Sequence, residues 1–195
     1  MKICLGFDGS DSDDWTAIRA ETVDGYQFTP TYEIGGDVAP TIWNPAMHGG
    51  LIPRSHVHAA VEQIFDTYKV ERFYCDPPDW KTEIETWALQ YGEKVVVRWE
   101  TYRPKQMHEA LKRFVTDLSQ GSITHDGCPI TKTHMDNARK EPKPYQRYLL
   151  AKPVGAYHQK IDAAMATVLA HEAAADARAA GWTGEQERTY KLIGW

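Results

Sequence analysis

The sequence has 195 residues and a mass of 22.2 kDa, enough for one compact domain with a sizeable core or for a domain plus a tail. Hydrophobic residues make up 42% and charged residues 25% of the chain, which is ordinary globular usage and excludes wholesale disorder. No apolar run approaches the roughly 20 residues that span a bilayer, and the first residues lack the pattern of a signal peptide. We therefore expect a soluble intracellular protein without a membrane partner.

The net charge of −5 would ordinarily argue against a polyanionic partner, but the charge is unevenly distributed. Residues 131–161 contain seven lysines and arginines against two acidic residues, a local charge of +5. Such a segment is either a solvated face or a surface that contacts phosphates. The three cysteines, Cys4, Cys75 and Cys128, are widely spaced and include no CxxC, which disfavours a disulfide framework or a zinc cluster.

An acidic loop, residues 8–14, follows the first apolar run of the chain. The run Ile3–Phe7 is rich in apolar β-formers and is stopped by Gly, Ser and Asp, so it predicts a buried strand with Asp8 at its carboxyl end. Four aspartates within seven positions repel one another unless they are solvated or bind cations. The loop is therefore either a solvated hairpin turn or part of a metal site.

The first third of the chain predicts a three-stranded antiparallel meander. Residues 15–23 alternate in polarity, Asp24-Gly25 is a strong hairpin turn, and residues 26–34 form the third strand, weakened by Pro30. Residues 35–53, rich in Gly and Pro, are expected to form a long loop, in an enzyme a possible substrate flap.

The middle of the chain alternates helices with short strands. We expect a helix capped by Ser55, followed by a strand over Val70–Cys75 that ends at Asp76. A helix capped by Asp79 and stopped by Gly92 comes next, and then a strand over Lys94–Trp99. The last helix of this part runs from Pro104 to Gly121, and its predicted inward residues are Met107, Leu111, Phe114, Val115 and Leu118. Asp76 thus repeats the strand-end setting of Asp8. The two prolines after Asp76 forbid continuation of that strand.

This order of elements, β-β-β-α-β-α-β-α, predicts a ribonuclease H-like α/β fold, a mixed sheet in which parallel strands extend an antiparallel meander and helices flank both faces. In that architecture the first and fourth strands are neighbours, roughly 4.8 Å apart. Asp8 and Asp76 would then meet at one edge of the sheet, a spacing that suits two metal ions about 4 Å apart.

The last third is expected to contain a turn or hairpin around Asp126-Gly127, a helix containing His134 and Asn137, a short strand over Tyr145–Ala151, and a helix from about Lys160 to Ala180. Asp162 falls in the first turn of that last helix, where the helix dipole favours a carboxylate for structural reasons alone. We place one domain at residues 1–180 and a C-terminal tail at 181–195.

Three carboxylates in the order strand end, strand end, helix start resemble the nuclease domain of the large terminase subunit of tailed bacteriophages. The resemblance rests on Phe7-Asp8-Gly9-Ser10 with Asp13-Asp14-Trp15-Thr16-Ala17-Ile18, on Phe73-Tyr74-Cys75-Asp76-Pro77, and on Lys160-Ile161-Asp162-Ala163-Ala164-Met165-Ala166. It runs from the start of the chain to about Ala175. The sequence lacks the G-x-x-x-x-G-K-[ST] loop of the packaging ATPase found in complete large subunits.

By this resemblance, Asp8, Asp76 and Asp162 would form the catalytic, metal-ligating triad, and Asp14 would be an additional ligand near the second metal. The family uses Mg²⁺ or Mn²⁺ to cut concatemeric double-stranded viral DNA during genome packaging, which implies a two-metal-ion endonuclease in the cytoplasm of the infected bacterial host. The implied partners are DNA, a packaging ATPase domain, the portal and the small terminase subunit. The basic segment would hold the DNA backbone through Lys160, Arg139, Lys143, Arg147 and Lys152.

Three other functions remain open from the sequence. Another ribonuclease H-like nuclease, such as a junction resolvase or a transposase-type enzyme, would share the metals and differ in substrate. Asp8-Gly9-Ser10 also resembles the first phosphate loop of actin-like sugar kinases, but the chain is too short for two such domains and has no second Gly-rich loop. The third possibility is a non-catalytic docking module of the packaging machine whose acids only bind structural cations or cap elements.

Overall fold

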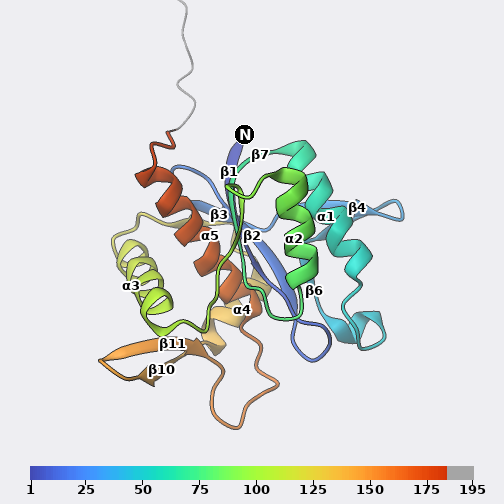
Figure 1. Cartoon of the computed structure of the whole chain (residues 1–195). Helices are drawn as coiled ribbons and strands as arrows, with labels where there is room; N and C mark the ends of the chain where they lie inside the picture. The colour runs from blue at the N-terminus through green and yellow to red at the C-terminus, as the bar shows by residue number, and fades with distance from the viewer. Residues whose placement is uncertain (184–195) are drawn as a thin grey trace, which may run out of the picture.

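The structure, a computed structural model, describes residues 1–183 and is built around one mixed sheet with the strand order β8-β7-β1-β2-β3-β9 (Figure 1). Strand β1 is antiparallel to β2 and parallel to β7, β7 is parallel to β8, and β6 adds to the end of β2. The strands of this sheet are β1 (Lys2–Asp8), β2 (Thr16–Glu21), β3 (Tyr26–Phe28), β6 (Ile42–Trp43), β7 (Lys69–Cys75), β8 (Val96–Arg98) and β9 (Thr124–His125). The predicted mixed sheet is therefore confirmed, including the pairing of the first and fourth predicted strands.

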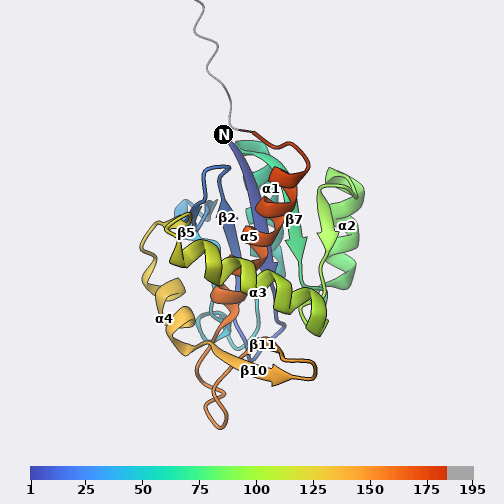
Figure 2. The ribbon, with the colours of Figure 1, turned by 90° about the vertical axis from the view of Figure 1, so that its left-hand side faces the viewer.

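Helices cover both faces of the sheet. They are α1 (Arg54–Thr67), α2 (Lys81–Tyr91), α3 (Pro104–Ser119), α4 (Pro129–Asn137) and α5 (Asp162–Ala179). Helices α1 and α2 lie on one face, and α5 lies on the other with α3 beside it (Figures 1 and 2). Alternate residues of β1 serve the two faces: Ile3, Leu5 and Phe7 pack in the core with α1 and α2, whereas Cys4 packs in the core with α3 and α5.

Helix α5 lies unusually close to β1 because Gly6 has no side chain. A Cβ at Gly6 would lie 2.1 Å from the carbonyl oxygen of Ala166 and 2.3 Å from the backbone nitrogen of Ala170. Every residue of α5 from Asp162 to Ala174 is buried, so the burial extends around the whole helix rather than along one face. The small residues of this helix allow that approach, which fixes the start of α5 against the sheet.

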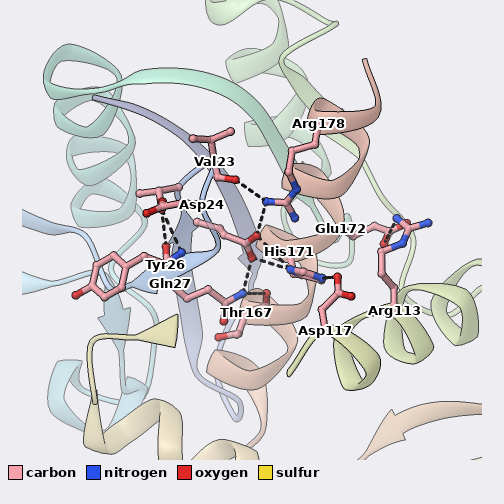
Figure 3. Close-up of polar contacts among 12 residues, drawn as sticks. Val23, Asp24, Tyr26, Gln27, Arg113, Asp117, Thr167, His171, Glu172 and Arg178 are labelled. Atoms are coloured by element: carbon pink, nitrogen blue, oxygen red, sulfur yellow. Dashed lines mark hydrogen bonds and ion pairs between the residues drawn. The ribbon is translucent and has the colours of Figure 1, made fainter. Parts of the chain in front are cut away.

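A buried polar network ties α5 to β2, β3 and α3 (Figure 3). Glu21 of β2 is completely buried, and its carboxylate accepts hydrogen bonds from Gln27 Nε2 at 2.7 Å and Arg178 Nη1 at 3.0 Å. His171 Nδ1 lies 2.9 Å from the same carboxylate, and its Nε2 lies 3.0 Å from Asp117 Oδ2 on α3. Because a buried charge is tolerated only when it is paired, this network fixes how α5 sits on the sheet.

The predicted third strand is wrong in its second half. Strand β3 ends at Phe28, and β4 (Thr31–Ile34) pairs instead with β5 (Asp37–Pro40) in a separate two-stranded sheet. Pro30 lies at the break, where it has no N–H to donate to a ladder. The predicted loop 35–53 therefore contains β5, β6 and the 3₁₀ helix Pro45–His48.

Both predicted helix caps are wrong. Ser55 lies inside α1, whose N-cap is Pro53, and the N-cap of α2 is Trp80 rather than Asp79. Asp79 has a φ of 61° and its carbonyl accepts a hydrogen bond from Arg54 at 2.8 Å. The loop before α2 is thus fixed by Arg54, which also lies 4.3 Å over the Trp80 ring, and not by a capping carboxylate.

Two further predictions on α3 and β9 need correction. Val115 and Leu118 of α3 are 44% and 47% exposed, although the other three predicted inward residues are buried. Of the turn or hairpin predicted around Asp126-Gly127, the hairpin is wrong: strand β9 ends just before these residues and adds to the edge of the main sheet parallel to β3, and Asp126 Oδ1 accepts from the backbone N–H of Cys128 at 3.1 Å.

Between α4 and α5 the chain forms a second hairpin, β10 (Arg139–Lys143) with β11 (Arg147–Ala151). The predicted strand over 145–151 is confirmed in its main part, and β10 was missed because its proline argues against a strand. A two-stranded ladder away from the main sheet has free edges where proline is tolerated.

The division at residue 180 stays a prediction. Helix α5 ends at Ala179, and Trp182, 6% exposed, packs in the core with α3 and α5. Residues 184–195 of the predicted tail lie outside the described residues. In the described part of the chain, no helix combines the length and hydrophobicity needed to cross a bilayer.

Candidate metal centre

Asp8 and Asp76 lie at the same edge of the sheet, as the strand-end pattern predicts. Strands β1 and β7 run parallel with Phe7 opposite Cys75, and the backbone N–H of Asp76 donates to the carbonyl of Phe7 at 3.0 Å. The next residue of each strand is the aspartate. Asp76 is only 7% exposed and Asp8 is partly buried.

Asp162 is the first residue of α5, the helix that lies on the opposite face of the sheet from α1 and α2 (Figure 1). It is 6% exposed, and its Oδ2 atom is buried without a hydrogen-bond partner. The position of the helix start is fixed by His134, whose Nδ1 accepts from the backbone N–H of Ala163 at 3.0 Å. Trp15 packs edge-on against the His134 ring at 5.1 Å. Asp162 therefore has a fixed backbone and one free carboxylate oxygen.

Burial raises the pKa of all three carboxylates, and nearby negative charges add to it. Burial raises the pKa of Asp8 well above its usual range, and the negative charges of Asp162, Asp76 and Asp14 raise it further. Burial, and then the charge of Asp14, raise the pKa of Asp162 from 3.8 to about 6. Burial also raises the pKa of Asp76. Uncompensated negative charge is thus concentrated at the ends of β1, β7 and α5, where a bound cation would relieve it.

Thr101 holds the carboxylate of Asp76, a contact that sequence reasoning missed. Its hydroxyl donates to Asp76 Oδ2 at 2.6 Å and its backbone N–H donates to Oδ1 at 3.2 Å. Thr101 follows β8, which neighbours β7 in the sheet, so the contact depends on how these two strands align. Its position after the predicted strand 94–99 was the one signal available, and it does not distinguish Thr101 from its neighbours.

Asp14 is held by two lysines of the basic segment. Lys160 Nζ lies 2.7 Å from Asp14 Oδ1, and Lys152 Nζ contacts the same oxygen. Burial alone would raise the pKa of Asp14, but the hydrogen bonds and charges of Lys152 and Lys160 outweigh it and lower the pKa. Two residues predicted to bind DNA and one predicted to bind metal are therefore brought together by the fold.

The other three residues predicted to bind DNA lie on the β10–β11 hairpin. Arg139 donates to the backbone carbonyls of Asp136 and Ala138, Lys143 Nζ lies 2.9 Å from a carboxylate oxygen of Glu141, and Arg147 lies 5.4 Å from the Tyr145 ring centroid. Each of these contacts is local to its own segment, unlike those of Lys152 and Lys160.

The acidic loop is rigid at its start. Trp80 Nε1 donates to the carbonyl of Ser10 at 3.0 Å, and a Cβ at Gly9 would lie 2.6 Å from the Trp80 ring. Asp11 is paired with Arg54 at 2.6 Å. These contacts hold the loop that follows Asp8, and the Asp11 carboxylate is paired with Arg54 instead of joining the other carboxylates.

The donors fit a hard divalent cation, although a complete ligand shell is not formed. Among residues 1–183, no group of three or more His, Cys, Asp or Glu side chains is arranged so that it could hold a metal ion. The unpartnered Oδ2 of Asp162, and the negative charges of Asp162 and Asp76 that act on Asp8, nevertheless match the oxygen-only donor set that Mg²⁺ and Mn²⁺ prefer. The parallel pairing of β1 and β7 already places Asp8 beside Asp76.

Comparison with solved structures identifies the fold. The chain superimposes on the large terminase nuclease from thermophilic phage G20c with bound magnesium with a TM-score of 0.62, covering 88% of this chain and 80% of that one at 12% identity. On the HK97 bacteriophage large terminase the TM-score is 0.64, covering 87% of this chain and 38% of that one at 16% identity. The chain has the ribonuclease H-like fold of large terminase nucleases.

Sequence comparison links this terminase nuclease fold to phage proteins. The Gene 13 protein of Mycobacterium phage D29 is 34% identical over 186 residues, which is 90% of this chain and 30% of the phage protein. The chain thus spans about a third of the length of that relative. No protein-family model matches the sequence.

Proposed function

We propose that the chain is a metal-dependent endonuclease that cleaves double-stranded viral DNA concatemers during genome packaging. The observation that carries the proposal is that Asp8 and Asp76 end two paired strands and that the charge of Asp162, which has an unpartnered oxygen, acts on Asp8, in a fold shared with terminase nucleases. Three elements far apart in the sequence supply these carboxylates. Solvation or helix capping alone does not require that convergence.

In this proposal Asp8, Asp76 and Asp162 are the catalytic ligands of a divalent cation, Mg²⁺ or Mn²⁺, and Asp14 lies beside the position of a second. Bound divalent cations polarise a phosphodiester and lower the pKa of a water molecule. The residues of the chain do the positioning: Thr101 orients Asp76, and the His134 contact with Ala163 orients Asp162. No side-chain nucleophile is needed.

The basic segment would bind the DNA backbone. Lys152 and Lys160 lie beside the carboxylates, and Arg139, Lys143 and Arg147 extend the positive charge along the β10–β11 hairpin. Phosphate contacts carry no base information, so we expect little sequence preference and a binding constant that falls with salt.

The proposed setting is the packaging machine in the cytoplasm of the infected bacterium. The nuclease domain, residues 1–180, would work with a packaging ATPase domain, the portal and the small terminase subunit. The greater length of the D29 relative is consistent with further domains beside this one.

The test is incubation of supercoiled and linear plasmid with the protein in Mn²⁺, Mg²⁺ or EDTA. We expect metal-dependent nicking and linearisation by the wild type and by Asp13→Asn, a control in the same loop, and loss of cleavage in Asp8→Asn. Equal inactivity of folded wild type and Asp8→Asn in every metal would refute the nuclease and favour a docking module. Selective cutting of four-way junctions or RNA–DNA hybrids would instead indicate a resolvase or another ribonuclease H-like enzyme.

A further inference from the structure

We propose that Lys152 and Lys160 form a clamp on Asp14 that prevents this carboxylate from binding a second cation until DNA phosphates take over the two ammonium groups. The inference rests on the proposed function and assigns a regulatory contact within the same site. It makes Asp14 a positioning residue for two lysines in the DNA-free protein. Asp14 becomes a metal ligand only in the complex with DNA.

The contacts of the clamp converge on one atom. Both ammonium groups contact Asp14 Oδ1, with Lys160 Nζ at 2.7 Å. The lysine side chains are 21% and 19% exposed and that of Asp14 is 35% exposed, so water screens these pairs less than it screens a surface ion pair. The two ammonium groups occupy Oδ1 and leave Oδ2 for a cation, but a cation bound there would lie beside two positive charges and be repelled by them.

The two lysines reach Asp14 from different segments. Lys152 follows β11 and Lys160 precedes α5. The backbone carbonyl of Lys160 accepts a hydrogen bond from Asn137 Nδ2 of α4 at 2.9 Å, which fixes the chain there. By contrast, Lys132 pairs with Asp136 one helical turn away, as an ordinary surface lysine does. The long-range convergence of two lysines on one acid is therefore a specific feature of the site.

The charge of the site explains why DNA would release the clamp. Four carboxylates, Asp8, Asp14, Asp76 and Asp162, face two ammonium groups, so the fully ionised site is balanced by a single divalent cation. A second divalent cation would leave two excess positive charges among half-buried groups. The phosphates of a bound DNA strand supply matching negative charge and are better partners for ammonium groups than a carboxylate shared with a metal.

The experiment counts Mn²⁺ ions bound to the full chain by calorimetry and by electron paramagnetic resonance of free Mn²⁺. We expect one ion per chain in the wild type, and two in the Lys152→Met/Lys160→Met variant, whose second site is tightened by about tenfold or more. The Lys132→Met/Lys140→Met variant removes the same charge from the same segment and should still bind one ion. Asp14→Asn should bind one ion in every background.

The DNA arm uses a phosphorothioate duplex, whose integrity is checked on a gel, and a matched methylphosphonate duplex that lacks backbone charge. The Mn²⁺ that each duplex binds alone is subtracted from the count. The charged duplex should raise the wild-type count from one ion to two, and the uncharged duplex should leave it at one. Two ions of equal affinity in DNA-free wild type, or one ion in the clamp variant, would overturn the clamp while leaving the nuclease intact. Binding of no ion by wild type, with or without DNA, would overturn the proposed metal centre and the clamp with it.

Discussion

Replacing Asp162 by asparagine should stabilise the metal-free protein, although it removes a proposed catalytic ligand. Burial and the charge of Asp14 raise the pKa of Asp162 from 3.8 to about 6. Keeping this carboxylate ionised therefore costs the folded state about 3 kcal/mol above pH 6, at about 1.4 kcal/mol for each unit between the two pKa values. The asparagine removes the charge but buries an amide, which costs about 1 kcal/mol. The expected net gain is about 2 kcal/mol at pH 8.

The pH dependence gives the sign of the effect. Between pH 3.8 and about 6 the folded wild type binds a proton that the unfolded chain has released, so its stability relative to Asp162→Asn falls as the pH rises through this window. The advantage of the variant should therefore be absent at pH 4 and complete above pH 6. Urea unfolding at several pH values in EDTA measures it.

Asp126→Asn is a matched control with the opposite sign. Burial would raise the pKa of Asp126, but the hydrogen bond from Arg19 and those from backbone N–H groups outweigh burial and lower it from 3.8 to about 2. Because Asp126 is exposed and water screens its partners, its ionised form stabilises the fold by only about 1 kcal/mol above pH 3.8, and this contribution is lost as the pH falls toward 2. Asp126→Asn should thus be less stable than wild type at pH 8. If Asp162→Asn were also less stable there, or if its effect did not vary with pH, the electrostatic reasoning would be refuted.

Four further outcomes test other parts of the structure. Gly6→Ala should lower the free energy of unfolding by about 3 kcal/mol, because a Cβ meets the α5 backbone, whereas Gly92→Ala, in open space with a positive φ, should cost only about 1 kcal/mol in the same urea titration. Glu21→Ala should cost about 3–5 kcal/mol by leaving its buried partners unpaired, and a loss below 1 kcal/mol would contradict the network. Thr101→Val should weaken Mn²⁺ binding about tenfold by calorimetry and Thr101→Ser should restore it; equal affinities in all three proteins would remove Thr101 from the site. Cys128 is only partly buried, whereas burial raises the pKa of both Cys4 and Cys75, so iodoacetamide should modify Cys128 in the folded protein before these two, as mass spectrometry would show.

The strand-end aspartates could be placed from the sequence because their setting depends on short-range signals. A run of apolar β-formers followed by Gly or Pro ends a strand wherever it occurs, and parallel pairing then brings Asp8 and Asp76 together. Asp162 could be placed at a helix start by the same local logic, although the burial of its whole helix could not. An apolar stripe predicts one buried face, whereas the close approach at Gly6 buries the others as well.

Contacts between distant segments could not be predicted from the sequence. The link from Thr101 to Asp76 depends on the alignment of two strands, and the link from Lys152 to Asp14 joins residues 138 positions apart. The incorrect prediction of Asp79 as a helix cap has the same origin. Arg54, which belongs to another helix, donates a hydrogen bond to the Asp79 carbonyl and fixes the loop before α2, so no capping carboxylate is needed there. Local propensity identifies which residues are available, and tertiary packing decides which of them meet.

The position of α5 in the chain has a consequence for folding during synthesis. Strand β1, which carries Asp8, is made before the helix that covers Gly6 and carries Asp162, the last helix of the described chain. At ribosomal rates, roughly 8 to 30 seconds separate the synthesis of Asp8 from that of Asp162. A nascent chain therefore has an uncovered central strand and an incomplete carboxylate set until α5 docks. The step that completes the core is therefore also the step that brings the third carboxylate into position.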